Sequence, residues 1–297
     1  MVQEERRGIK MRRNDRKKQG RKEMFFIIAL FITGLLIAVY PLTAQVYHFY
    51  LAQQNIETFE KEREHVEYED VQRRIYLAEI YNETLISLGQ TGLVDPFSEL
   101  EKEARAEYAR MLKLEEMIGH VSIPKIDTKI PIYAGTSESI LQRGAGHLEG
   151  TSLPVGGQST HAVITAHRGL PQARLFTDLD KLKEGDLFYV TNIRDTLAYQ
   201  VDQIQVIEPH QVEVLHIQEE RDIVTLLTCT PYMINSHRLL VTGHRVEYIQ
   251  ELAEEQAVQG RNETLVVLIL SVCGIVIVIG IACWHFSYYF KHHRRRK

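Results

Sequence analysis

Cysteine is scarce in this 297-residue chain, and its placement points to one reactive thiol. Cys273 and Cys283 lie inside a long apolar run near the C-terminus, which leaves Cys229 as the only cysteine in the polar part of the chain. Cys229 ends a β-branched, apolar segment, and Pro231 stops that segment because proline cannot extend an internal strand. An unpaired cysteine at such a position indicates a reactive thiol or an intermolecular disulfide, with a buried structural cysteine as the alternative.

Two further residues have the chemistry to assist a thiol. His167 ends the apolar segment at residues 161–167, and Arg238 begins the segment at residues 238–247. The thiolate is the nucleophilic form and is sparsely populated at neutral pH, so an imidazole that exchanges protons with it would activate it. A guanidinium would stabilise the negative charge that builds on a carbonyl oxygen under attack. Cys229, His167 and Arg238 therefore predict nucleophilic acyl transfer if strand ends bring them together.

The other histidines and arginines leave alternatives open. Seven histidines lie between residues 147 and 244, so a metal site is the natural rival. However, neither Cys-x-x-Cys nor His-Glu-x-x-His occurs, and His161 and His167 would share a strand face without being adjacent; we expect no metal and no other cofactor. Arg245 would face the opposite side of a regular strand from Arg238 and is expected to be a structural ion-pair partner. Arg168 is expected to be solvated.

Short β-type segments recur from residue 119 onward and predict an all-β barrel or sandwich over residues 119–250. They are residues 120–126, 130–134, 161–167, 186–192, 198–207, 222–229 and 238–247. A short helix is expected at residues 175–182. Upstream, a helical region is expected over residues 48–118: charge and helix formers predict a helix at residues 51–82, and Ser98 with Glu101 forms a capping box that starts another helix ending near residue 116.

The two ends of the chain predict membrane anchoring. Residues 24–42 and 264–284 are free of charge and long enough to cross a bilayer, and the basic tails at 1–23 and 285–297 flank them. Basic flanks stay inside, so both termini are expected in the cytoplasm and residues 48–263 outside, with a linker at residues 251–263. The alternatives are a cleaved signal peptide for the first run and a buried helix for the second. The region between the basic tails is acidic, unlike a nucleic-acid binder.

The chain resembles the sortases, membrane-bound transpeptidases of Gram-positive bacteria. The resemblance covers roughly residues 90–250 and lies in Thr-Leu-Leu-Thr-Cys229-Thr-Pro-Tyr, Thr-Ala-His167-Arg-Gly-Leu-Pro and Asn-Ser-His-Arg238-Leu-Leu-Val-Thr-Gly-His-Arg, with a further match at residues 147–157. It implies an eight-stranded β-barrel in which Cys229 attacks the Thr–Gly bond of an LPxTG-type signal. A thioacyl enzyme would form and an amine would resolve it, with His167 as acid/base and Arg238 orienting substrate or stabilising the oxyanion.

Three features resemble the class C, pilin-polymerising branch: Thr-Pro-Tyr after the cysteine, the second apolar run, and Asp95-Pro96-Phe97. In that branch the aspartate of the lid pairs with the catalytic arginine, an aromatic ring covers the thiol, and the acceptor is a lysine of another pilin. The same three residues also read as a turn before a capped helix. The alternatives are a sortase that attaches surface proteins to peptidoglycan, a plain cysteine protease, and a non-catalytic membrane scaffold or adhesin.

Overall fold

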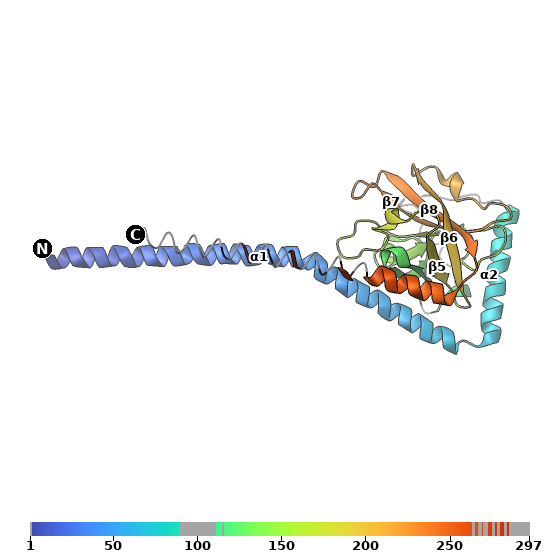
Figure 1. Ribbon diagram of the computed structural model, residues 1–297, viewed down its shortest axis with the longest axis horizontal. Helices are drawn as coiled ribbons and strands as arrows, with labels where there is room; N and C mark the ends of the chain where they lie inside the picture. Colours follow the sequence, from blue (N-terminus) through green and yellow to red (C-terminus); the bar gives the residue numbers. More distant parts are fainter. Residues whose placement is uncertain are drawn as a thin grey trace. The chain divides into compact units, whose positions relative to one another are not determined.

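Eight β-strands close into a barrel in the computed structural model, which describes residues 2–88, 111–114 and 116–262 and scattered positions between 265 and 284. The strands are β1 (Met117–Ile123), β2 (Thr128–Ala134), β3 (Ala145–His147), β4 (Thr160–Thr165), β5 (Leu187–Thr191), β6 (Thr196–Ile207), β7 (Asp222–Thr230) and β8 (His237–Val246). Their order around the barrel is β1-β2-β3-β4-β7-β8-β6-β5, and Figure 1 labels β5 to β8. The predicted eight-stranded, mainly β architecture is confirmed.

The strand β7 lies between a parallel neighbour, β4, and an antiparallel neighbour, β8. Its side chains are buried without interruption from Ile223 to Cys229, so both faces of the strand are covered. A strand covered on both faces has a near-continuous apolar sequence rather than alternation, which is what residues 222–229 show. Leu227 belongs to a buried cluster that joins β4, β7 and β8 under the turn η4 (Val212–Leu215). The strand that carries Cys229 is therefore held rigidly.

Several boundaries differ from the sequence expectations. The three-residue strand β3 was not predicted, and it pairs in parallel with β2. The expected helix at residues 175–182 is a single turn of 3-10 helix, η3 (Leu179–Lys181). The predicted helix end near residue 116 is wrong, because Leu114 forms a β-bridge with Met117. Its beginning at Ser98 lies outside the described residues.

Two helices replace the single one expected at residues 51–82. They are α1 (Val2–His65) and α2 (Tyr68–Leu88), which starts after a break at residues 66–67. Two acidic residues in the first turn of α2 oppose the positive end of its dipole and favour a helix start there. Within α2, Val71, Ile75 and Ala78 are buried at a spacing of three to four residues, which is the pattern of a helix packed along one face.

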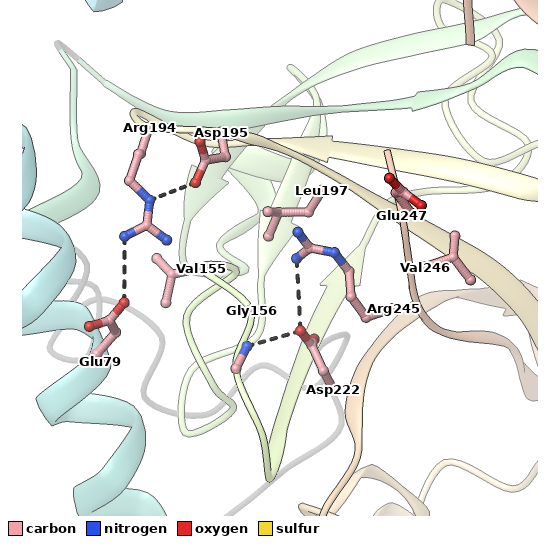
Figure 2. A pocket seen from close by; sticks show the side chains of 11 residues that line it. Glu79, Val155, Gly156, Arg194, Asp195, Leu197, Asp222, Arg245, Val246 and Glu247 are labelled. Atoms are coloured by element: carbon pink, nitrogen blue, oxygen red, sulfur yellow. Dashed lines mark hydrogen bonds and ion pairs between the residues drawn. The ribbon is translucent and has the colours of Figure 1, made fainter. Parts of the chain in front are cut away.

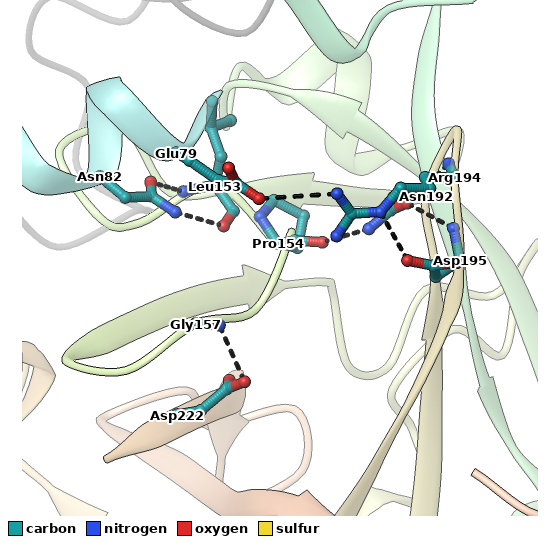
Figure 3. Close-up of polar contacts among 9 residues, drawn as sticks. All are labelled: Glu79, Asn82, Leu153, Pro154, Gly157, Asn192, Arg194, Asp195 and Asp222. Atoms are coloured by element: carbon teal, nitrogen blue, oxygen red, sulfur yellow. Dashed lines mark hydrogen bonds and ion pairs between the residues drawn. The ribbon is translucent and has the colours of Figure 1, made fainter. Parts of the chain in front are cut away.

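Polar contacts fix α2 to the barrel, as Figure 3 shows. The buried side chain of Asn82 donates to the carbonyl of Leu153 at 3.1 Å and accepts from the amide of Leu153 at 2.7 Å. One turn earlier, Glu79 pairs with Arg194 at 3.5 Å. The Asn82 side chain thus satisfies both backbone polar groups of the buried residue Leu153, which lies outside the strands. The helix α2 is therefore packed on the barrel and is not a loose spacer.

The segment expected as a linker at residues 251–263 is helical from 250 to 262. It contacts the barrel, since the hydroxyl of Tyr189 donates to Gln256 at 3.1 Å. Gly260 is required there, because a Cβ at this position would come within 1.9 Å of the carbonyl oxygen of Pro124. The barrel strands therefore occupy residues 117–246 instead of 119–250, and a helix follows them.

Among the described residues, one helical stretch, Ala29–His65, is long and apolar enough to cross a membrane. Its most apolar window has no buried side chains, and Phe25, Phe26 and Phe31 are 75%, 72% and 65% exposed. Such a surface is unusual for a helix in water and fits a lipid surrounding. The second expected span, residues 264–284, lies mostly outside the described residues.

Candidate active site

The backbone register brings the three predicted residues to one end of the barrel. Cys229 on β7 is the direct partner of Arg238 on β8. On the other side of β7, the last parallel pair with β4 joins Thr165 and Leu227. If this register is extended by two residues in each chain, His167, which lies past the end of β4, comes level with Cys229. Since neighbouring strands lie about 4.8 Å apart, His167, Cys229 and Arg238 form one row across three adjacent chain segments.

Hydrogen bonds carry the pairing of β4 and β7 past the end of β4. The amide of Ala166 donates to the carbonyl of Leu227 at 3.2 Å, and the hydroxyl of Thr228 donates to the carbonyl of Ala166 at 2.7 Å. The backbone immediately before His167 is thus fixed to the backbone immediately before Cys229. The histidine is presented at the start of a loop, but the loop begins from a rigid sheet, which is the arrangement that catalytic groups require.

The three side chains are shielded from solvent to different degrees. Cys229 and Arg238 are 6% and 7% exposed, and the His167 side chain is 18% exposed. The Nη1 atom of Arg238 donates to the carbonyl oxygens of Asn235 and His237 at 3.0 and 3.1 Å, which orients the guanidinium. A permanently charged group that is held in place on the strand partner of a cysteine can stabilise an oxyanion without reorganising, so the row is suited to acyl transfer.

The sortase domain family matches residues 121–246 of the chain. The structure of sortase C-1 from Streptococcus pneumoniae is 57% identical and similar at a TM-score of 0.63, over 66% of this chain and 100% of that one. Sortase C1 of Streptococcus agalactiae is 55% identical at a TM-score of 0.63, over 67% and 99%. Sortase A of Bacillus anthracis is 29% identical over 53% of this chain and 73% of its own length. This chain belongs to the sortase family.

Membership fixes the class of reaction and the compartment. Sortases are cysteine transpeptidases, and they are membrane-associated enzymes of the cell wall. The similar structures at 52–57% identity are sortase C structures from streptococci, so the resemblance to the class C branch is confirmed. This sortase differs from the sequence expectation at two polar residues near His167, namely Arg168 and Glu138.

Arg168 is not solvated, contrary to expectation. Its side chain is 8% exposed, and its guanidinium pairs with Asp180 at 2.6 Å. It also donates to the carbonyl of Thr177 and to the hydroxyl of Thr230, both at 3.1 Å. Thr230 directly follows Cys229, so Arg168 ties the loop that starts at the histidine to the strand end that carries the cysteine. The expectation was wrong because these partners lie 9 to 62 residues away in the sequence.

Glu138 was missed altogether. It opens the four-residue helix α3 (Glu138–Leu141), and both of its carboxylate oxygens lie 3.2 Å from Nε2 of His167. The sequence held little signal for this contact, because the two residues are 29 positions apart and belong to no common pattern. A carboxylate at this distance can accept a hydrogen bond from an imidazole N–H.

His161, the rival metal ligand, lies at the other end of β4 with both ring nitrogens engaged. Nδ1 contacts the carbonyl of His216 at 2.9 Å and Nε2 contacts the hydroxyl of Thr225 at 2.7 Å. Burial lowers the pKa of His161 to about 4, so the ring is neutral at physiological pH. Within the described part of the chain, no group of three or more His, Cys, Asp or Glu side chains could hold a metal ion.

Arg245 lies at the opposite end of β8 from Arg238, about 23 Å away at about 3.3 Å per residue. There it lines a hollow of about 610 Å³, shown in Figure 2, and its Nη1 approaches Asp222 to 3.8 Å. This confirms the expected ion-pair role. Burial raises the pKa of Asp222, while the amide of Gly157 donates to the same carboxylate at 2.9 Å. This charged hollow is separate from the row that contains Cys229. Asp95, Pro96 and Phe97, for which the sequence predicts a lid, lie outside the described residues.

Proposed function

We propose that this sortase polymerises pilins: it cleaves an LPxTG-type signal between Thr and Gly at Cys229 and transfers the threonyl group to a lysine amine of another subunit. The proposal is supported by the row of His167, Cys229 and Arg238 and by the related structures. Sortase C of Streptococcus pneumoniae, 53% identical over 97% of its chain, acts on pilin substrates, and the 52% identical sortase C of Group B Streptococcus is pilus-related.

In the acylation step, the thiolate of Cys229 adds to the threonyl carbonyl carbon. The carbonyl oxygen becomes an oxyanion, which the guanidinium of Arg238 stabilises. When the intermediate collapses, the C–N bond to glycine breaks, and the imidazolium of His167 donates the proton that the leaving amine needs. The products are a thioester on Cys229, a neutral imidazole and a free glycyl amine, so charge and protons balance.

In the transfer step, the neutral imidazole left by acylation acts as the base. It takes a proton from the incoming lysine amine, whose nitrogen adds to the thioester carbonyl. The C–S bond then breaks and the thiolate of Cys229 leaves, which restores the thiolate–imidazolium pair. The new bond is an amide between threonine and the lysine side chain. One histidine thus serves as acid and then as base, which a row of three groups on a rigid sheet permits.

The test uses the full chain in detergent, a pilin carrying an LPxTG-type signal, and a pilin carrying acceptor lysines. We expect a thioester on Cys229 by mass spectrometry and a ladder of covalent polymers on a denaturing gel. Cys229→Ala should give neither product. Wall-peptide conjugates in place of the ladder would favour anchoring to peptidoglycan, and hydrolysis alone in the presence of added amines would favour a protease.

We further propose that residues 24–42 and 264–284 both span the membrane with both termini inside, which places the barrel outside with its substrates. Support comes from the exposed apolar helix surface near residues 25–37 and from the basic flanks. Labelling of single cysteines placed in each tail by an impermeant reagent on intact cells should fail until the cells are opened. Labelling of either tail on intact cells would contradict the topology.

For residues 95–97 we propose a lid that covers the thiol. The proposal rests on the sequence resemblance alone, and an exposed Asp–Arg pair contributes only about 0–1 kcal/mol, so such a lid would open readily. Replacing Asp95 and Phe97 by Ala should raise the rate at which a methanethiosulfonate reagent modifies Cys229. An unchanged rate would rule out coverage of the sulfur.

A further inference from the structure

We propose that Glu138 is the residue that binds the incoming lysine as an ammonium ion and delivers it to His167. This inference rests on the proposed transfer to a lysine. It assigns the acceptor a contact of its own, distinct from the row of residues that binds and cleaves the sorting signal. The chemical class recognised is a cationic primary amine.

The position of the Glu138 carboxylate supports this role. Both oxygens lie 3.2 Å from Nε2 of His167, and the side chain is 60% exposed. His167 itself is 18% exposed. The carboxylate therefore extends from the acid/base of the reaction to open solvent. An amine that approaches His167 from solvent on this side meets the negative charge first, and at short range this charge attracts a cation.

The backbone that carries Glu138 is held firmly. Glu149 is 9% exposed, and its carboxylate accepts from the amide of Thr136 at 3.3 Å and from the hydroxyl of Thr136 at 3.1 Å. Gln142 donates to Glu138 at 3.0 Å, and Leu141 is fully buried beneath the same turn. The buried carboxylate of Glu149 thus fixes the backbone two residues before Glu138. The contact between Glu138 and His167 is thus built into the fold.

The chemistry of the acceptor explains why such a group is useful. A lysine with a pKa of about 10.4 carries its proton at neutral pH and is not nucleophilic in that form. After acylation His167 is neutral and can take one proton from the ammonium, and the second proton leaves to solvent as the amide forms and the C–S bond breaks. Glu138 contacts the ring nitrogen and can contact the ammonium at once, so it aligns the donor with the base.

The experiment compares two acceptors on the pre-formed acyl enzyme of the full chain. One is a lysine-bearing pilin, which is cationic, and the other is hydroxylamine, which is neutral at pH 7. For Glu138→Gln we expect the apparent KM for the lysine acceptor to rise roughly tenfold, the scale of one charge-assisted contact. Acylation and transfer to hydroxylamine should stay within about twofold, because the amide oxygen of the new glutamine can still accept from Nε2 of His167 and neither step needs the negative charge.

The matched control is Glu116→Gln, which removes a carboxylate of similar exposure, 64%, that pairs with Arg143 instead of the histidine. It should leave the apparent KM for the lysine acceptor, the acylation rate and the rate of transfer to hydroxylamine unchanged. Equal losses in acylation and in both transfers would mean that Glu138 only orients His167, and an unchanged KM would remove it from acceptor binding; either result overturns the inference. If wild-type enzyme formed no lysine-linked product, the proposed function itself would fail, whatever the variants do.

Discussion

Removing the charge of Arg168 should weaken the fold and slow the reaction. In Arg168→Met the side-chain stem stays, but the contacts to Asp180, Thr177 and Thr230 are lost. Breaking a fully buried charged pair costs about 3–5 kcal/mol, but Asp180 is 50% exposed and regains water. We therefore expect a loss of about 2–3 kcal/mol in the free energy of unfolding, within the range of about 1.5–3 kcal/mol that hydrogen bonds to a charged group contribute.

The effect on activity follows from what Arg168 connects. Thr230 directly follows Cys229 and Arg168 directly follows His167, so the guanidinium joins the segment that carries the proposed nucleophile to the segment that carries the proposed acid/base. Loss of about 1.4–2.7 kcal/mol of transition-state stabilisation through this link would lower kcat/KM by roughly 10- to 100-fold. Urea unfolding gives the stability, and cleavage of a fluorescent sorting-signal peptide gives kcat/KM below the unfolding range. Arg168→Lys should recover part of the stability through Asp180.

Arg174 supplies the control. It lies in the same segment and pairs with Asp178, but its side chain is 53% exposed. An exposed pair contributes about 0–1 kcal/mol, so Arg174→Met should leave both stability and kcat/KM nearly unchanged. If Arg168→Met behaved like Arg174→Met, the buried guanidinium would not hold the two strand ends together. If it lost stability but kept full kcat/KM, the link would be structural only.

Three further outcomes are expected. Lowering the pH from 7.5 to 5 should lower the free energy of unfolding by about 2 kcal/mol for each of His147 and His161. Burial lowers the pKa of both rings to about 4, so in this pH range they take up protons only when the chain unfolds. A urea midpoint independent of pH would contradict this. Asn82→Ala should remove both bonds to Leu153, cost about 1–3 kcal/mol and expose α2 to limited proteolysis. Gly169→Ala should destabilise the site by about 1–3 kcal/mol, because φ is +89° there; equal urea stability of variant and wild type would refute this.

The sequence predicts strands and candidate residues correctly where the pattern is local. Residues 222–229 are apolar and β-branched without interruption, and the strand they predict is buried on both faces. Cys229 could be singled out because the other two cysteines lie in an apolar run. Motif resemblance predicts roles for His167 and Arg238; the register pairs Arg238 with Cys229, and on β4 it ends two residues before His167.

The misses share a physical cause. The strand β3 has only three residues and exists through its pairing with β2 and β4, so no local pattern announces it. Arg168 and Glu138 are ordinary polar residues by type, and their roles depend on partners brought close by the barrel. A nucleophilic thiol can be recognised from the residue type alone, because few side chains have that chemistry. A residue that positions the nucleophile or binds its substrate is of a common polar type. Only its neighbours in space therefore distinguish it from ordinary surface charges.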